Sequence, residues 1–502
     1  MPMLPLQIPP GLFRNGTRYQ GAGRWIDGNL VRWHESTMRP VGNWEPLGEG
    51  SSGGAVDLAE IVAGMHSWRG NDGIARLALG TPEKAYAYVE GALTDITPAA
   101  FTTGGGVATS TTGQYGSGAY GAGLYGEGDP GIVNLTEAQS WQFDAFGQIL
   151  VATAYSDGRM LSWDLNTSND LAVIANAPTD VEGLVVTPER FLVALGKNGD
   201  GRVVAWADQQ TLTTWTPATT NQAGDFPLAT QGTLLAGRRG RGETLLWTTR
   251  DLWSMQFIGG TLVYSFRMLG AECGAISRRA MTVVGGGMAL WMGRRNFFVY
   301  DGHVRSLPSE VGDYVFGDIN RFQSSLVHAV TISEFNEVWW FYPSRTSDVV
   351  NRYVTYNYAE GHWTTGTIGR SAGVDRGAFD RPIMAAPSGK VFVHEAGSTK
   401  LDPAGNTIVP FAESGPIELG AGDTRMWIRQ VIPDERTLGD VAVRLRARGY
   451  PTEAAQLAGP FPAGEPTLTR VSGRQVELRL DQVSDFWRVG NFRLEVVPAE
   501  QR

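Results

Sequence analysis

The sequence predicts an all-β fold built around a β-propeller of about seven four-stranded blades. Three observations predict it: a turn-rich composition, a segment ending in a large aromatic that recurs at nearly constant spacing, and the lack of long stretches with helical periodicity. Among 502 residues there are 65 glycines and 26 prolines, which favours many short strands joined by tight turns. The length exceeds that of one ordinary domain, so an array of repeats or several domains are expected.

The recurring segment fixes the repeat length. It occurs as GRMLSWD, GRVVAWAD, ETLLWTTRDLW, GMALWMGRRNFFVYDG and NEVWWFYP, with Trp163, Trp206, Trp247, Trp291 and Trp339 as the aromatic positions. Successive tryptophans are 43, 41, 44 and 48 residues apart. A four-stranded propeller blade needs about 40 to 50 residues, so each interval has the length of one blade.

Tyr88 and Phe392 extend the series on either side, once a low-complexity insertion at 102–130 is set apart. We therefore expect the propeller to span residues 56–400, with six to eight blades compatible with the spacing. Stacked β-sandwiches are the alternative fold.

The residue pattern within one repeat is also typical of a propeller blade. In VEGLVVTPERFLVALGKNGDGRVVAWAD, two short runs rich in valine and leucine flank the turn-prone KNGDG. No amphipathic helices of 10–15 residues alternate with these runs, which disfavours a TIM barrel.

Two flanking regions differ from the repeats. Residues 1–55 are expected to form an N-terminal arm with first strands, dense in arginine and tryptophan between residues 11 and 47. Residues 401–502 are expected to form a small antiparallel β-sheet or sandwich domain. In DVAVRLRARGY, the residues from Val441 to Arg448 alternate between apolar and mostly charged, the period of a half-exposed strand.

Charge and cysteine content limit the function. The formal net charge of -9 disfavours a surface that grips a phosphate backbone. The single cysteine, Cys273, cannot form an internal disulfide, and the first residues lack the features of a secretory signal, so we expect folding in a reducing cytoplasm. No apolar run approaches the roughly 18 residues of a membrane-spanning helix.

A search for catalytic chemistry predicts no enzyme, no cofactor and no metal site. The six histidines are dispersed without metal-ligand spacing, and Cys273 is expected to be a small buried apolar residue. Serine-nucleophile motifs are absent, and SDGRMLSW, with Asp157 and Trp163, lacks the spacing of a sialidase-type Asp-box.

The glycine-rich GRRGRGE at 237–243 lacks the phosphate-binding P-loop pattern and is expected to be a blade hairpin. Its arginines, Arg238, Arg239 and Arg241, are candidates for facing a lumen or passing DNA.

Two groups of aromatic residues are candidates for contacts between subunits. Trp25 and Trp33 lie in the arginine- and tryptophan-dense arm. Tyr115, Tyr120 and Tyr125 follow one another at intervals of five in the insertion, each before a glycine, a period of neither strand nor helix. The insertion is either a flexible linker or a loop whose tyrosines anchor it on a neighbouring subunit.

Several phrases resemble tail structural proteins of short-tailed bacteriophages. They are YQGAGRWIDGNLVRW…MRPVGNW, the tyrosine-glycine repeat, SGRQVELRL…FWRVGNFRLEVVP, and the middle region GDFPLATQGTLLAGRRGRGETLLWTTRDLW…GMALWMGRRNFFVYDG. The middle region is similar to the tail-hub, or packaged DNA stabilization, proteins of P22-like phages and more distantly to T7-like tail nozzles. The tyrosine-glycine insertion departs from the P22-like pattern.

The resemblance implies a virion structural protein, assembled in the host cytoplasm as a homo-hexameric ring below the portal and the head-to-tail adaptor. It implies contacts with tail fibres or a tail needle, transient non-specific contact with the leaving genome, and a role in genome retention and ejection. The alternative function is a receptor-binding, or carbohydrate-binding or carbohydrate-hydrolysing, propeller at the tail tip.

Overall fold

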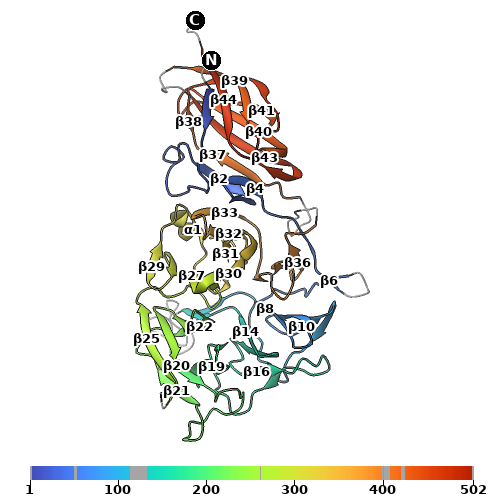
Figure 1. Cartoon of the computed structure of the whole chain (residues 1–502), viewed down its shortest axis with the longest axis vertical. Coiled ribbons are helices and arrows are strands. Elements are labelled where there is room, and N and C mark those ends of the chain that lie inside the picture. The colour runs from blue at the N-terminus through green and yellow to red at the C-terminus, as the bar shows by residue number, and fades with distance from the viewer. Residues whose placement is uncertain are drawn as a thin grey trace, which may run out of the picture.

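The repeats fold into a ring of four-stranded antiparallel sheets in the computed structural model of the chain (Figure 1). The structure describes residues 3–49, 54–112, 133–260, 262–397, 400, 407–419 and 424–499. Within these residues, seven such sheets succeed one another between Gly64 and His394, and the all-β prediction is confirmed. The first strand of each sheet lies beside the first strand of the next, and β34 lies beside β8, which closes a seven-bladed propeller.

Each blade is numbered here from its innermost strand outward. Blades 1 to 4 consist of β8 (Gly64–Arg69), β9 (Ala75–Gly80), β10 (Ala85–Val89) and β11 (Ala92–Asp95); β14 (Trp141–Phe146), β15 (Ile149–Ala154), β16 (Met160–Trp163) and β17 (Ala172–Val173); β18 (Gly183–Val186), β19 (Leu192–Lys197), β20 (Asp200–Trp206) and β21 (Gly224–Pro227); and β22 (Leu234–Arg239), β23 (Thr244–Thr248), β24 (Leu252–Phe257) and β25 (Tyr264–Gly270).

Blades 5 to 7 complete the ring. They consist of β26 (Met281–Val284), β27 (Met288–Met292), β28 (Phe297–Tyr300) and β29 (Val304–Leu307); β30 (His328–Ile332), β31 (Glu337–Tyr342), β32 (Arg352–Asn357) and β33 (His362–Thr367); and β34 (Ala372–Val374), β35 (Ile383–Ala385), β36 (Val391–His394) and β5 (Trp44–Pro46).

Local chemistry explains both the hairpins and the packing between blades. The turn of KNGDG joins β19 to β20, with Asn198 at φ 50° and Gly199 at φ 85°, the consecutive left-handed pair of a type I′ hairpin turn. Between blades 1 and 2, the Trp141 ring lies against the backbone of Gly80, where a Cβ atom would stand 2.2 Å from the indole. Blade packing therefore requires glycine at that position.

The recurring tryptophans do not occupy equivalent positions. Trp163 and Trp206 end the third strands of blades 2 and 3, whereas Trp247, Trp291 and Trp339 lie in the second strands of blades 4 to 6. All five are buried, because both middle strands of a blade are covered by the neighbouring blades. The spacing therefore reports blade length and not a fixed place in the blade.

Blade 7 is closed by the N-terminal segment. Its outermost strand is β5, which pairs with β36 so that Trp44 lies opposite His394 and Pro46 opposite Phe392. The two ends of the propeller are thus held together by hydrogen bonds between strands about 350 residues apart in the sequence.

The C-terminal residues form a β-sandwich above the propeller in Figure 1. Val441, Val443, Leu445 and Ala447 of β40 are buried and the arginines between them are not, so the predicted alternation is confirmed. One sheet has the order β1 (Met3–Leu6), β44 (Phe492–Pro498), β39 (Met426–Pro433) and β42 (Thr467–Gly473); the other has β2 (Trp25–Asn29), β37 (Phe411–Ser414), β43 (Gln475–Arg488), β40 (Leu438–Arg448) and β41 (Gln456–Pro462), with β38 (Ile417–Glu418) also on β43.

The first 46 residues therefore belong to both bodies. Strands β1 and β2 join the sandwich, β5 joins the propeller, and the hairpin of β3 (Val31–His34) and β4 (Thr37–Pro40) lies between them. Met38 of β4 exchanges backbone hydrogen bonds of 2.9 Å with Val489. The side-chain Oδ1 of Asn29 accepts a hydrogen bond of 2.8 Å from the backbone amide of Thr367 in blade 6. This segment ties the sandwich to the propeller.

The remaining elements are short. They are α1 (Gly312–Asp318), the 3-10 turns η2 (Gly285–Gly287), η3 (Ser324–Leu326) and η4 (Ser333–Phe335), and the hairpins β6 (Gly48–Glu49) with β7 (Gly54–Ala55) and β12 (Thr109–Thr112) with β13 (Val133–Thr136). In the described parts of the chain, no helix has the length and apolar character to span a membrane.

Candidate functional site: the central cavity of the propeller

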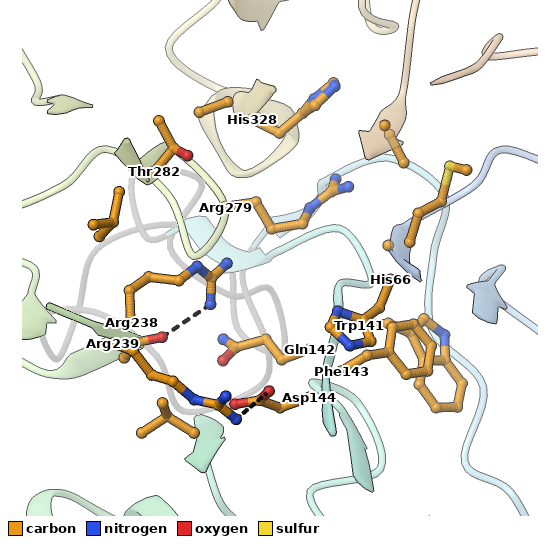
Figure 2. A pocket seen from close by; sticks show the side chains of 18 residues that line it. His66, Trp141, Gln142, Phe143, Asp144, Arg238, Arg239, Arg279, Thr282 and His328 are labelled. Atoms are coloured by element: carbon orange, nitrogen blue, oxygen red, sulfur yellow. Dashed lines mark hydrogen bonds and ion pairs between the residues drawn. The ribbon is translucent and has the colours of Figure 1, made fainter. Parts of the chain in front are cut away.

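The innermost strands of all seven blades surround a cavity of about 390 Å³ (Figure 2). The ring brings together side chains from strands that are far apart in the sequence, which is how a propeller creates a site on its axis. The polar residues on its wall are His66, Gln142, Asp144, Arg238, Arg239, Arg279, Thr282 and His328.

Three arginines and one carboxylate set the charge of the cavity. Arg239 of blade 4 is paired with Asp144 of blade 2, at 3.0 Å between Nη2 and Oδ1, and its Nε donates to the carbonyl of Val186 at 2.6 Å. Asp144 also accepts from the backbone amide of Val186 at 2.8 Å. These contacts join blades 2, 3 and 4 and hold the Asp144 carboxylate in place.

The other two arginines have no carboxylate partner among the described residues. Arg238 donates from Nη1 to the carbonyl of its neighbour Gly237 at 2.9 Å. Arg279, which is 9% exposed, donates from Nη1 to the carbonyl of Ser371 at 3.0 Å, and its buried Nε has no described partner. Burial lowers the pKa of Arg279 to about 10, so it remains charged at neutral pH.

Two histidines complete the polar wall. Burial, together with the adjacent Arg279, lowers the pKa of His328 to about 3, so the ring is neutral at pH 7. Burial also lowers the pKa of His66. The Nε2 atoms of both rings are buried without a hydrogen-bond partner in the described structure. Figure 2 shows His66 and Arg238 extending toward the cavity from opposite sides.

The described wall of the cavity carries neither a cysteine nor a cluster of metal-ligating side chains. The described residues contain no group of three histidine, cysteine or acidic side chains that could hold a metal ion. Cys273 lies elsewhere, buried between blades 4 and 5, where burial raises the pKa of its thiol to about 11. What the cavity offers is positive charge and hydrogen-bond donors, which suit an anion.

The structure places only some of the predicted site residues at the cavity. Arg238 and Arg239 line the cavity, on the axis of a single propeller, whereas Arg241 is exposed in the β22–β23 turn and does not line it. Trp25 and Trp33 are 5% and 3% exposed in the chain's own core, where their rings are 6.2 Å apart, so they offer no surface to another subunit. The prediction that Trp25 and Trp33 contact another subunit is corrected, because these side chains pack inside the chain and hold the arm in place.

The three tyrosines predicted as contact residues, Tyr115, Tyr120 and Tyr125, lie outside the described residues.

Sequence reasoning missed His66, Asp144, Arg279 and His328. His66, Asp144 and His328 each sit singly in an apolar stretch, whereas Arg279 follows Arg278, and only ring closure brings the four together. The one available signal was the doubled arginine. It occurs in GRRG and SRRA, at the inner strand of a blade or next to it, but also in GRRN, between the second and third strands of blade 5.

A second feature lies on the sandwich, at the ends of its two longest strands. We define the β40–β43 tip as Leu438–Asp440 together with Val483–Phe486. Leu438, Val483 and Phe486 are 47%, 64% and 68% exposed there. Beside the tip lies a groove of about 480 Å³, whose wall includes Phe461 and Val483. The tip thus combines projecting apolar side chains with an adjacent apolar groove.

Comparisons with known proteins give the chain no family. No family matches it, and no curated protein matches its sequence. Among solved structures it is similar to streptogramin B lyase, at 7% identity over 70% of this chain and 96% of that one, with a TM-score of 0.40. It is also similar to a fungal alcohol oxidase of the AA5 family in complex with copper, at 11% identity over 92% and 100% of the two chains, with a TM-score of 0.42. At such identities and TM-scores these likenesses carry no argument about function.

Proposed function

We propose that the protein is a non-enzymatic structural subunit of a short-tailed phage tail, of the hub or nozzle type, that assembles with other copies of itself into a ring around the genome channel. The proposal combines the resemblance in the sequence with the β40–β43 tip, the structural observation that carries most of it. Subunits of this kind need no cofactor. They do need surfaces that bind neighbouring subunits.

The tip supports assembly because of its composition. Soluble monomers rarely gather large exposed apolar side chains in one place, and such clusters mark interfaces. Phe486 projects from the tip while the groove beside it, with Phe461 on its wall, is open to receive an apolar side chain. A surface with both a projection and a recess suits head-to-tail contact between identical subunits, which closes into a ring when the rotation permits.

The way the arm joins the two bodies also supports a mechanical role. The chain passes from the sandwich into the β3–β4 hairpin and then into blade 7, so that force on the sandwich is transmitted to the propeller through paired strands. The overall charge of -9 favours the passage of DNA without tight binding.

Sedimentation of the purified full chain tests the proposal. We expect the wild-type protein to form a species of about six subunits and Phe486→Asp to reduce it to monomer without lowering the unfolding temperature. Leu262→Asp is the matched control, because Leu262 is 72% exposed on the propeller, away from the tip. A wild-type monomer at high concentration, or equal assembly of all three proteins, would contradict the proposal. Release of reducing ends from host polysaccharide would favour the carbohydrate-hydrolysing alternative instead.

A further inference from the structure

The central cavity concentrates positive charge in a protein that is negative overall. Arg238, Arg239 and Arg279 stand against the single carboxylate of Asp144 on its described wall, which leaves an excess of two positive charges with the histidines neutral. The whole chain has a formal charge of -9. The excess is therefore local and not a consequence of composition.

Arg279 is buried and Arg238 is half-buried, and leaving such charge without compensation is unfavourable. Removing an ion from water costs several kcal/mol even after the protein relaxes, unless a counter-charge offsets it. Arg279 has only the carbonyl of Ser371 as a described side-chain partner, and Arg238 only that of Gly237. Hydrogen bonds to carbonyl oxygens satisfy a donor but do not neutralise a guanidinium.

The free donors surround the cavity. Arg238 comes from blade 4, His66 from blade 1 and Arg279 from the start of blade 5 (Figure 2). The unpartnered Nε2 of His66 and Nε of Arg279 are both buried. Donors converging from different directions match the oxygens of a tetrahedral anion better than the two coplanar oxygens of a carboxylate.

We propose that the central cavity of the propeller binds a phosphate-class oxyanion, held by Arg238 and Arg279 with a hydrogen bond from the His66 imidazole. The doubly negative charge of phosphate equals the excess on the wall. A volume of about 390 Å³ exceeds that of one phosphate, so a phosphate ester also fits. The site lies within one chain, and it therefore does not depend on ring assembly.

Calorimetric titration of the full chain with inorganic phosphate, in chloride buffer of matched ionic strength, tests this directly. We expect saturable binding with one site per chain and a rise in unfolding temperature with phosphate concentration. Sulfate should compete with phosphate and acetate should not. Adenosine monophosphate in a second titration distinguishes the source: tighter binding than phosphate identifies an ester as the ligand, and weaker binding identifies the free anion, both within the proposal.

Two variants on the same hairpin localise the binding. Arg238→Gln should weaken phosphate binding at least about tenfold, because it removes a charged donor from a partly desolvated site. Arg241→Gln is the control, since Arg241 is exposed two residues beyond the end of β22 and does not line the cavity. Arg279→Met is a second test: it should abolish the phosphate-dependent rise in unfolding temperature while leaving the anion-free protein no less stable. Absence of phosphate binding, equal weakening by Arg238→Gln and Arg241→Gln, or binding of DNA with no response to small anions would overturn the proposal.

Discussion

Arg32 shows at the scale of one residue how the arm is fastened to the propeller. From β3 it reaches Glu337 of blade 6 at 3.1 Å and Glu395, just after blade 7, at 2.8 Å. The Arg32 and Glu337 side chains are each 2% exposed. Glu395 also accepts a 3.0 Å hydrogen bond from the backbone amide of Gly42. One cation from the arm thus pairs with two carboxylates, one in blade 6 and one just after blade 7.

Replacement of Arg32 should be strongly destabilising. Arg32→Met removes the ion-pair partner of the buried Glu337 and of the partly buried Glu395, so we expect a loss of about 3–5 kcal/mol in the free energy of unfolding, measured by urea denaturation. Arg39→Met is the control, because Arg39 on the adjacent strand pairs with the exposed Glu35. This variant should lower the free energy of unfolding by less than about 1 kcal/mol. Similar losses in both variants would show that the buried network is not what holds the arm.

His328 predicts a dependence of stability on pH. Burial holds its pKa at about 3 in the folded protein, against 6.5 when unfolded, so between these values the unfolded chain binds a proton that the folded chain does not. Stability should therefore fall as pH decreases below 6.5, by at most about 1.4 kcal/mol per pH unit from this residue. His328→Gln should make the slope between pH 6.5 and 5 shallower, whereas His303→Gln, at an exposed position, should leave it unchanged. An unchanged slope in His328→Gln would contradict the assignment.

At the scale of elements, the three-residue strand β5 is expected to contribute strongly to the stability of the propeller. Trp44 is 3% exposed, its ring lies over His394 with centroids 5.4 Å apart, and the Arg370 guanidinium lies 4.9 Å from it. The strand completes blade 7 and thereby closes the ring between its first and last blades.

Truncation of Trp44 should weaken the packing of β5 on blade 7 and so destabilise the closed propeller. We expect Trp44→Ala to cost about 3–5 kcal/mol in unfolding free energy, the range for large buried aromatics, with a matching fall in unfolding temperature. Trp427→Ala provides a control of equal chemistry, because Trp427 is 43% exposed on the sandwich and should change stability little. If both variants unfold alike, β5 does not close the propeller.

The same elements show what the sequence can and cannot predict. The blade period and the alternation in β40 follow from local patterns of apolar residues, and both predictions are confirmed. Strand β5 has only the residues WEP within an arginine-rich arm, and its role as the last strand of blade 7 depends on pairing with β36 far along the chain. The burial of Trp25 and Trp33 likewise depends on the sandwich, which is built from the other end of the sequence. Contacts between segments far apart in the sequence produce no repeating pattern of residues, so the sequence does not predict them.

At the scale of the whole molecule, the insertion emerges from a defined stem. Strands β12 and β13 pair between blades 1 and 2, and next to them Ala108 exchanges hydrogen bonds of 2.8 and 3.0 Å with the side chain of Gln323, which precedes blade 6. Glu137 at the other end of the stem pairs with Arg278. The base of the insertion is therefore part of the propeller, and trimming must preserve it.

Shortening the insertion should separate folding from assembly. Replacing residues 113–132 with Asn-Gly, a turn suited to joining paired strands, should leave the β-type circular dichroism and the unfolding temperature unchanged. If the tyrosines are anchors between subunits, ring formation should weaken at least about tenfold in sedimentation experiments. Loss of the β-type spectrum would show that the replaced residues are required for the fold, and undiminished assembly would remove them from the interface.

The proposed ring of subunits is tested most directly by a cryo-electron microscopy map of the phage particle to which the proposal assigns this protein. Docking the propeller and sandwich into the map should place six copies around the tail axis, with the β40–β43 tip of each copy against its neighbour. Peripheral trimers, or a particle that lacks the protein, would contradict the account.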